Sequence, residues 1–241
     1  CIRDSYGGTR NFIETHFKSY GIEFSFTNDL TIKSFEDCIQ ENTKLIYIET
    51  PSNPMLKLVD IFAIAKLGKR SGILTAIDNT FATPVIQKPI ALGIDIVIHS
   101  ATKYFGGHSD ITAGVVAASN STIEALWDLA KDFGGNLSDF SAWMLERSMK
   151  TLGIRVRAQQ KNAFKIAKFL ESHPAIKKVY YPGLKTHPDH ALAKLQMKGF
   201  GAMLSFELSD EYGVETFFKS LELIKPSMSL AGVESTVILP S

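Results

Sequence analysis

The sequence predicts an α/β fold in which a mainly parallel sheet is flanked by helices and followed by part of a smaller α+β domain. Three short apolar runs, at 44–49, 73–77 and 94–98, each end in polar or turn-forming residues, and helical patterns separate them. Alternating buried strands and helices are typical of parallel sheets with crossover helices. With 241 residues, the chain can bury a sizeable core in one large domain or two smaller ones.

The segments before and between these runs carry helix signals. Apolar residues over 11–20 follow helical spacing up to Gly21, and residues 22–26 alternate as in a strand. Thr31 and Asp60 are suitable N-caps for two further helices that begin directly after them. We therefore expect a helix before each of the first two central strands and a loop, at 79–89, before the third.

Beyond residue 110 the pattern predicts a strand at 113–118 and an amphipathic helix at 121–133. A long helical pattern at 139–171, which Gly153 is expected to break, marks the passage from a large domain (1–150) to a second one (151–241). The second domain is expected to contain strands at 176–181 and 202–208 and helices at 189–197 and 213–221.

Composition narrows the class of partner. A net charge of +1, with both signs mixed along the chain, argues against a nucleic-acid surface and favours a small-molecule partner. Cys1 and Cys38 fit neither a disulfide framework nor a metal motif, which is typical of a reducing cytoplasm. No apolar run reaches the roughly 20 residues that span a bilayer. The chain has no initiating methionine and ends just after an apolar run, so it looks cut at both ends.

Polar side chains follow three of the expected strands. Asn53 lies in TPSNP, Asp78 in AIDNT, and Ser100 to Lys103 follow the third strand. Asn and Asp are also common turn formers, and a loop lysine is often only solvated, so each residue alone has an ordinary explanation. Because ligands of parallel sheets bind at the carboxyl ends of the strands, the three together indicate a site.

These residue types match the requirements of pyridoxal phosphate. The Lys103 amine can form a Schiff base with the aldehyde, and Asp78 can keep the pyridine nitrogen protonated. Ser100 and Thr102 offer hydroxyls to the phosphate, and Tyr6 in YGGT can stack on the ring. The sequence therefore predicts a pyridoxal phosphate site.

Five segments, in order, resemble one known family: IETPSNP, AIDNTFATP, HSATKYFGGHSD, LERSMKTLGIRV and SMSLAGVES. Over its whole length the chain resembles the trans-sulfuration enzymes of Cys/Met metabolism, namely cystathionine γ-synthase, cystathionine β-lyase, cystathionine γ-lyase and methionine γ-lyase. The resemblance implies the fold type I, or pyridoxal phosphate-dependent transferase-like, architecture and a homotetramer built as a dimer of dimers.

The resemblance also implies an activity. That activity is elimination or replacement at the β or γ carbon, with a cystathionine γ-synthase or β-lyase expected first. A methionine γ-lyase or cysteine-cleaving C–S lyase is the alternative, and a non-catalytic assembly module of the same fold is a different class.

The resemblance assigns roles residue by residue. Lys103 would be the Schiff-base lysine and proton shuttle, Asp78 the partner of the pyridine nitrogen, and Asn53 the neighbour of the ring hydroxyl. Tyr6 would stack on the ring and help take the substrate's amino proton. The remaining implied contacts are phosphate binding by Ser100 and Thr102, and a substrate pocket lined by Ser229.

The chain departs from the family at Met228 and Asn11, where the synthase and γ-lyase usually have Glu and Arg, and at Gly8, where methionine γ-lyase commonly has Cys. Arg10 could replace the missing cation. The family's N-terminal phosphate loop, its Tyr/Arg pair for the neighbouring subunit and its carboxylate-binding arginine all fall outside the 241 residues. For these residues alone the resemblance implies weak cofactor binding and no useful turnover.

Two other readings of the same segment are open. Ser100 to Lys103 is formally the S-x-x-K motif of penicillin-binding proteins, although that motif should open a helix and be joined by SDN and KTG elements. His99, His108 and Asp110 could form a zinc site, although their spacing fits no standard ligand pattern. We expect no metal.

Overall fold

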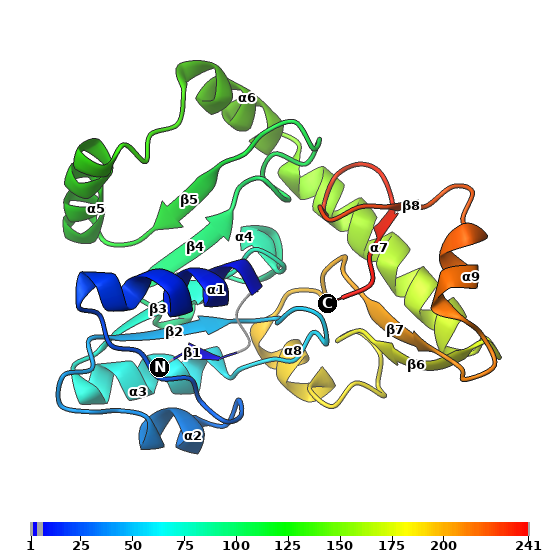
Figure 1. The fold of residues 1–241 in the computed structure, drawn as a ribbon, viewed down its shortest axis with the longest axis horizontal. Coiled ribbons are helices and arrows are strands. Elements are labelled where there is room, and N and C mark those ends of the chain that lie inside the picture. The colour runs from blue at the N-terminus through cyan, green and yellow to red at the C-terminus, as the bar shows by residue number, and fades with distance from the viewer. Residues whose placement is uncertain (1, 4–6, 241) are drawn as a thin grey trace.

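The computed structural model describes residues 2–3 and 7–240, with side chains from residue 7 onward. The larger part of the molecule is built on a five-stranded sheet in the order β1-β2-β3-β4-β5 (Figure 1). Strands β1 to β4 are parallel, and β5 pairs antiparallel with β4. The bounds are β1 Ile2–Arg3, β2 Leu45–Glu49, β3 Leu74–Asp78, β4 Ile96–Ser100 and β5 Gly114–Ala117.

Helices cover both faces of this sheet. Helix α1 (Gly7–His16) lies over one face, where Thr9 hydrogen bonds to the Tyr47 side chain. Helices α2 (Ile32–Asp37) and α3 (Ile61–Ser71) pack on the opposite face, against a core that includes alternate residues of β2. The mainly parallel α/β fold expected from the sequence is confirmed.

Local signals set the ends of these helices. The Thr31 side chain accepts a hydrogen bond from Ser34 N, and that of Asp60 from Ala63 N, so both expected N-caps are confirmed. Gly21 closes the 3-10 turn Phe17–Tyr20 with a φ of 69°, in the left-handed region that glycine tolerates. Two short helical turns, α4 (Thr83–Ile86) and Pro89–Leu92, precede β4.

The strand expected at 22–26 is wrong. Among these residues only Phe26 forms an isolated bridge. Aromatic packing takes the place of strand pairing, since the Phe24 ring lies 6.4 Å from that of Phe17 and 5.5 Å from that of Phe26, measured between centroids.

The second half of the described chain is mainly helical. Helix α5 (Asn120–Phe133) is followed by α6 (Asp139–Met149) and by α7 (Leu152–Glu171). The break expected at Gly153 falls instead at Lys150 and Thr151, because the Ser148 carbonyl accepts from Thr151 N and from the Arg155 guanidinium.

A small sheet follows α7. Strands β6 (Ile176–Tyr180) and β7 (Ser205–Leu208) pair antiparallel, and α8 (His190–Gln196) lies between them in sequence. The chain ends through α9 (Val214–Lys219) and the short parallel pair β8 (Lys225–Pro226) and β9 (Thr236–Val237), beside α7 in Figure 1. None of the helices in the described ranges is long and apolar enough to cross a bilayer.

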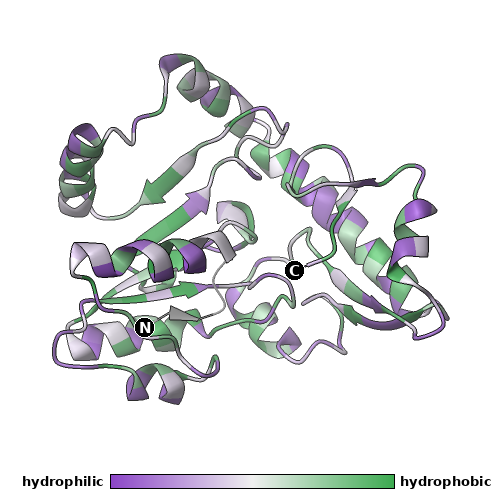
Figure 2. Ribbon diagram, viewed as in Figure 1, coloured by the Kyte–Doolittle hydropathy of each residue, from purple (hydrophilic) through white to green (hydrophobic). Residues whose placement is uncertain are grey.

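The apolar cores explain how α7 connects these parts. One cluster joins Tyr104 and Phe105, in the turn directly after β4, with Leu152 and Val156 of α7. A separate cluster packs the later turns of α7 against β6. Colouring by hydropathy shows β4 changing from hydrophobic to hydrophilic toward its carboxyl end, which is the edge that faces this junction (Figure 2).

Candidate active site

The three polar strand ends lie side by side. Glu49 at the end of β2 is in register with Asp78 at the end of β3, and Asp78 is in register with Ile98 of β4. Ser100, two residues further along β4, therefore points to the same face as Asp78. This is the face that α1 covers, and the carboxyl edge is where parallel sheets bind ligands.

Asp78 is a partly buried carboxylate with few partners. Thr80 N donates to its Oδ1 at 2.9 Å. Burial raises the pKa of Asp78, and the hydrogen bonds from Thr80 only partly oppose that rise. Among the side chains that the structure describes, none with a positive charge forms an ion pair with Asp78. The site therefore favours a ligand that brings a positively charged N–H.

Thr80 joins Asp78 to the neighbouring strand. Its hydroxyl donates to the Asp78 carboxylate and accepts from Ser100 N at 2.8 Å. Thr80 thus fixes the ends of β3 and β4 relative to each other. Sequence reasoning gave Thr80 no role, although its place two residues after an acidic strand end was a usable signal.

Lys103 lies in a compact turn directly after β4. Its backbone N–H donates to Ser100 O at 3.1 Å, and its carbonyl accepts from Gly107 N at 2.7 Å. Burial lowers the pKa of the Lys103 amine, so more of it is unprotonated near neutral pH than for an exposed lysine. An unprotonated amine is the form that attacks an aldehyde.

The Lys103 amine reaches a residue from the far end of the chain. Its Nζ donates to Ser229 Oγ at 3.2 Å. The Ser229 backbone is held by Ser227 Oγ, which accepts from Ser229 N, and by Thr236 Oγ1, which donates to Ser229 O. Met228, the departure from the family pattern, is 86% exposed.

The two expected phosphate ligands differ in their surroundings. The Thr102 hydroxyl donates to Ala113 O at 3.3 Å and accepts from Ala113 N at 3.0 Å, so it ties the turn to the start of β5. In the described part of the chain, the Ser100 hydroxyl has no such bond and is half-buried. Ser100 is thus the freer of the two hydroxyls to accept a ligand.

The other expected site residues are less close to this group. Tyr6 lies outside the described residues. Asn53 is exposed in a turn that Ser52 closes through bonds to Leu56 and Lys57, and no described hydrogen bond connects it to Asp78 or Lys103. Arg10 pairs with Glu14 at 3.0 Å and lies over the Phe26 ring, so its contacts do not lead to Lys103.

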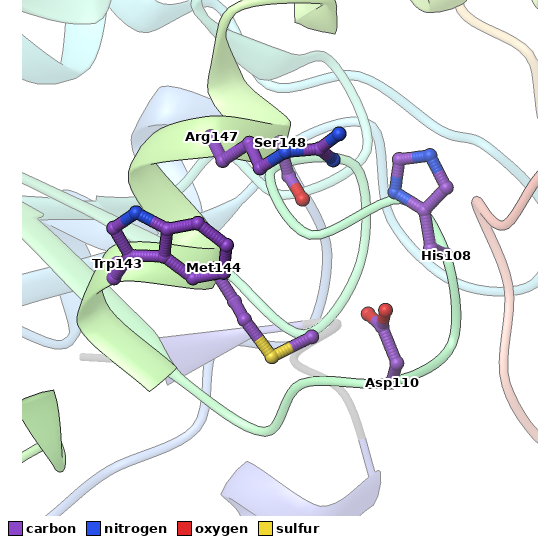
Figure 3. A pocket seen from close by; sticks show the side chains of 6 residues that line it. All are labelled: His108, Asp110, Trp143, Met144, Arg147 and Ser148. Atoms are coloured by element: carbon purple, nitrogen blue, oxygen red, sulfur yellow. The ribbon is translucent and has the colours of Figure 1, made fainter. Parts of the chain in front are cut away.

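The side chains of the zinc alternative lie in different environments. His99 is buried on the opposite face of β4, 4.9 Å from the Phe105 ring, and burial lowers its pKa to about 4. His108 and Asp110 line a pocket of about 160 Å³ together with four residues of α6, among them the cationic Arg147 (Figure 3). Within residues 7–240, no group of three or more such side chains could hold a metal ion.

The S-x-x-K alternative also disagrees with the geometry. Ser100 is the last residue of a strand and does not open a helix. The Lys103 amine bonds to Ser229 and not to Ser100. A serine nucleophile activated by Lys103 is therefore not supported.

Fold and site together define an α/β protein that places a half-buried lysine at the carboxyl edge of a parallel sheet, beside a carboxylate on the next strand. The family model for the Cys/Met metabolism PLP-dependent enzymes matches residues 1–241. The chain belongs to this family, which confirms the resemblance and implies pyridoxal phosphate as the cofactor.

Curated relatives and solved structures agree with this assignment. The chain is 46% identical over 239 residues to a cystathionine gamma-lyase of Bacillus subtilis, and 45% identical to a cystathionine beta-lyase of Lactococcus lactis. Each alignment covers 99% of this chain and 63% of the relative. A cystathionine gamma-lyase from Lactobacillus plantarum, complexed with L-serine, superposes with a TM-score of 0.96 at 44% identity, covering 99% of this chain and 64% of that one.

A synthase structure is nearly as similar. The cystathionine gamma synthase from Xanthomonas oryzae pv. oryzae, in complex with aminoacrylate and cysteine, gives a TM-score of 0.95 at 40% identity over 98% of this chain and 62% of that one. The chain thus spans less than two thirds of the length of these relatives.

The residues present fit pyridoxal phosphate. Asp78 is a partly buried carboxylate without a cationic partner among the described side chains, and the Lys103 amine has a lowered pKa. Ser100 adds a hydroxyl at the same strand edge. These are the three chemical groups that the pyridine nitrogen, the aldehyde and the phosphate require.

Proposed function

We propose that the protein containing this chain is a pyridoxal phosphate-dependent C–S lyase or transferase of sulfur amino-acid metabolism, of the cystathionine γ-synthase or β-lyase type. Methionine γ-lyase and cysteine-cleaving C–S lyase activities are the alternatives. The observation that carries the proposal is the half-buried Lys103 amine at the end of β4, in a chain of this family. Relatives named as γ-lyase, β-lyase and γ-synthase support the reaction class.

When bound, pyridoxal phosphate supplies an electron-accepting ring that stabilises negative charge at a substrate carbon. Asp78 would hold a proton on the pyridine nitrogen, since a protonated nitrogen stabilises a carboxylate that has no other cationic partner among the described side chains. Ser100 and Thr102 would bind the phosphate, with Thr102 turning its proton away from Ala113 O. Lys103 would bind the aldehyde and accept a proton at Nζ, and Ser229 would orient that nitrogen.

Tyr6 and Asn53 remain proposed contacts to the ring and its hydroxyl, and Ser229 a proposed part of the substrate pocket. The division into domains 1–150 and 151–241 remains a proposal as well, and the start of α7 at Leu152 supports it. The two cysteines without a disulfide pattern support a cytoplasmic location.

A homo-oligomer, with a tetramer as the family's arrangement, is part of the proposal. Four large aromatic side chains on or beside α5 and α6 are at least half exposed, namely Trp127, Phe133, Phe140 and Trp143. Exposed aromatic side chains of this size are enriched at protein interfaces. The small-molecule partner would be a sulfur-containing amino acid.

The test is an assay of the full-length protein with three substrate sets: cystathionine, acylated homoserine plus cysteine, and methionine. Pyruvate, 2-oxobutyrate and new thioether are scored separately, so that β-elimination, γ-elimination and replacement are distinguished. We expect one product to dominate, and an absorbance band that borohydride removes. If no substrate reacts and Lys103→Ala leaves the spectrum unchanged, the proposal is wrong.

A further inference from the structure

Two residues one turn apart on α7 hold the two loops that meet at the site. The Arg155 guanidinium donates to Tyr104 O at 2.8 Å and to Phe105 O at 3.3 Å, and these are the two residues directly after Lys103. Gln159 Nε2 donates to Gly232 O at 2.8 Å, three residues after Ser229. Residues four apart lie on the same face of a helix.

The Arg155 side chain is held by hydrogen bonds and packs closely against Gly107. Its Nε donates to Thr151 Oγ1 and its Nη2 to Ser148 O, so the guanidinium is fixed at the junction of α6 and α7. A Cβ at Gly107 would lie 1.9 Å from Arg155 Nη1, and the Gly107 φ of +70° also favours glycine. Only a glycine at this position leaves room for the guanidinium.

This contact completes the hydrogen bonding of the lysine turn. Gly107 N binds the carbonyl of Lys103, and Arg155 binds the next two carbonyls along the chain. The direction of the turn, and with it the direction of the Lys103 side chain, therefore depends on Arg155. Lysine could not replace it, since one ammonium lacks the planar fork that reaches two carbonyls.

The Ser229 loop depends on α7 in a similar way. Residues 227–235 contain no regular secondary structure, and the Gly232 carbonyl is the point at which Gln159 holds them. Gly232 also packs closely on the loop after Lys103, since a Cβ there would lie 2.8 Å from Ser109 Oγ. The C-terminal segment runs beside α7 in Figure 1.

We propose that Arg155 and Gln159 are positioning residues that keep Lys103 within hydrogen-bonding distance of Ser229, by fixing both loops to one face of α7. The inference rests on the proposed function, because it concerns how the cofactor lysine is oriented. It assigns α7 the task of aligning two residues that are 126 positions apart in the chain.

The test uses Arg155→Met and Gln159→Met in the full-length protein, because methionine keeps much of the volume without the donors. Arg157→Met and Gln160→Met are matched controls on the same helix. Arg157 is exposed, and Gln160 accepts from Phe200 N and Gly201 N, away from both loops. Two quantities are measured: the dissociation constant of pyridoxal phosphate, and the fraction of Lys103 labelled after borohydride reduction at saturating cofactor. Thermal unfolding is recorded for every variant.

We expect the dissociation constant to rise about ten-fold in each test variant, as for loss of a partly buried hydrogen bond, and the labelled fraction of Lys103 to fall. The controls should leave both quantities within about two-fold, even if Gln160→Met lowers the unfolding temperature. If Gln160→Met weakens the cofactor as much as Gln159→Met at equal loss of stability, the role is only structural and the inference fails.

A second experiment combines Ser229→Ala with Arg155→Met. If α7 acts through the Lys103–Ser229 contact, Ser229→Ala should change the labelled fraction clearly in the wild type and little in the Arg155→Met background. Additive effects would overturn the inference. A wild type that shows no label dependent on Lys103 would instead overturn the proposed function, so the two failures are distinguishable.

Discussion

The amine of Lys103 donates a hydrogen bond of 3.2 Å to the hydroxyl of Ser229. Lys103 follows a central strand of the large sheet, whereas Ser229 lies in the last loop before β9. The contact therefore reports whether the sheet, α7 and the C-terminal segment are in place together.

Thr80 is expected to contribute to cofactor binding through its hydroxyl. Thr80→Val keeps the shape but removes the group that bridges the Asp78 carboxylate and Ser100 N. We expect a dissociation constant for pyridoxal phosphate about ten-fold higher, in keeping with roughly 1 kcal/mol per hydrogen bond. Equilibrium titration by absorbance measures it, and Thr80→Ser, which retains the hydroxyl, should stay close to wild type. Equal losses in both variants would show that the methyl group matters instead.

Asp78→Asn is expected to weaken cofactor binding while stabilising the cofactor-free protein. Burial raises the folded-state pKa of Asp78 above its ordinary value of 3.8, so the stability that its protonated form provides is lost as pH rises through the raised pKa. The asparagine variant has no such loss. Its advantage in free energy of unfolding over the wild type should therefore be small near pH 4 and larger at pH 7.

Urea unfolding of the cofactor-free protein at these two pH values measures the difference. A variant that is less stable than the wild type at pH 7 by the same amount as at pH 4 would contradict the role of burial.

His99 is expected to make stability fall on mild acidification. Burial lowers its pKa from 6.5 to about 4. Between these two pH values, His99 is therefore protonated in the unfolded state but neutral in the folded state. The free energy of unfolding should decrease by up to about 3 kcal/mol as pH falls from 6.5 to 4. His99→Leu should remove most of this dependence, whereas His16→Gln, at an exposed position, should not. Unfolding in urea at several pH values decides between them.

Gly107→Ala is expected to resemble Arg155→Met. The new methyl group would occupy the position of the guanidinium and add left-handed backbone strain. Gly134→Ala is the matched control, because Gly134 has a φ of +79° with nothing within 4 Å of its Cβ position. Both variants should lose about 1 kcal/mol to backbone strain. Only Gly107→Ala should also weaken pyridoxal phosphate binding. Equal binding in the two variants would contradict the claim that a side chain at position 107 displaces the Arg155 guanidinium.

Much of the fold follows from local signals. The sequence predicts the N-caps Thr31 and Asp60 and the central strands, because helix capping and strand burial depend on residues that are close together in the sequence. The segment 22–26 alternates as a strand does, yet the same alternation of aromatic residues suits a loop whose rings pack on a helical turn. Glycine disfavours helices, so the sequence predicts the break before α7 at Gly153. The cause of the break is instead the Ser148 carbonyl, which accepts a hydrogen bond from the Arg155 guanidinium.

The site was predictable only in part. Lys103, Asp78 and Ser100 could be grouped because they end adjacent parallel strands. The contacts of Arg155 and Gln159 could not, since hydrogen bonds between residues 50 or 73 positions apart produce no periodic pattern in the sequence. Thr80 could have been added to the group, because it lies two residues after the acidic end of a strand. The roles assigned to Tyr6, Asn53 and Ser229 remain predictions.

The separation between Lys103 and Ser229 has a consequence during protein synthesis. The five strands that the structure describes in this sheet, with Asp78 and Lys103, are all translated by the end of β5, yet Ser229 follows more than 100 residues later. The Lys103–Ser229 contact can therefore form only after the C-terminal segment has been translated.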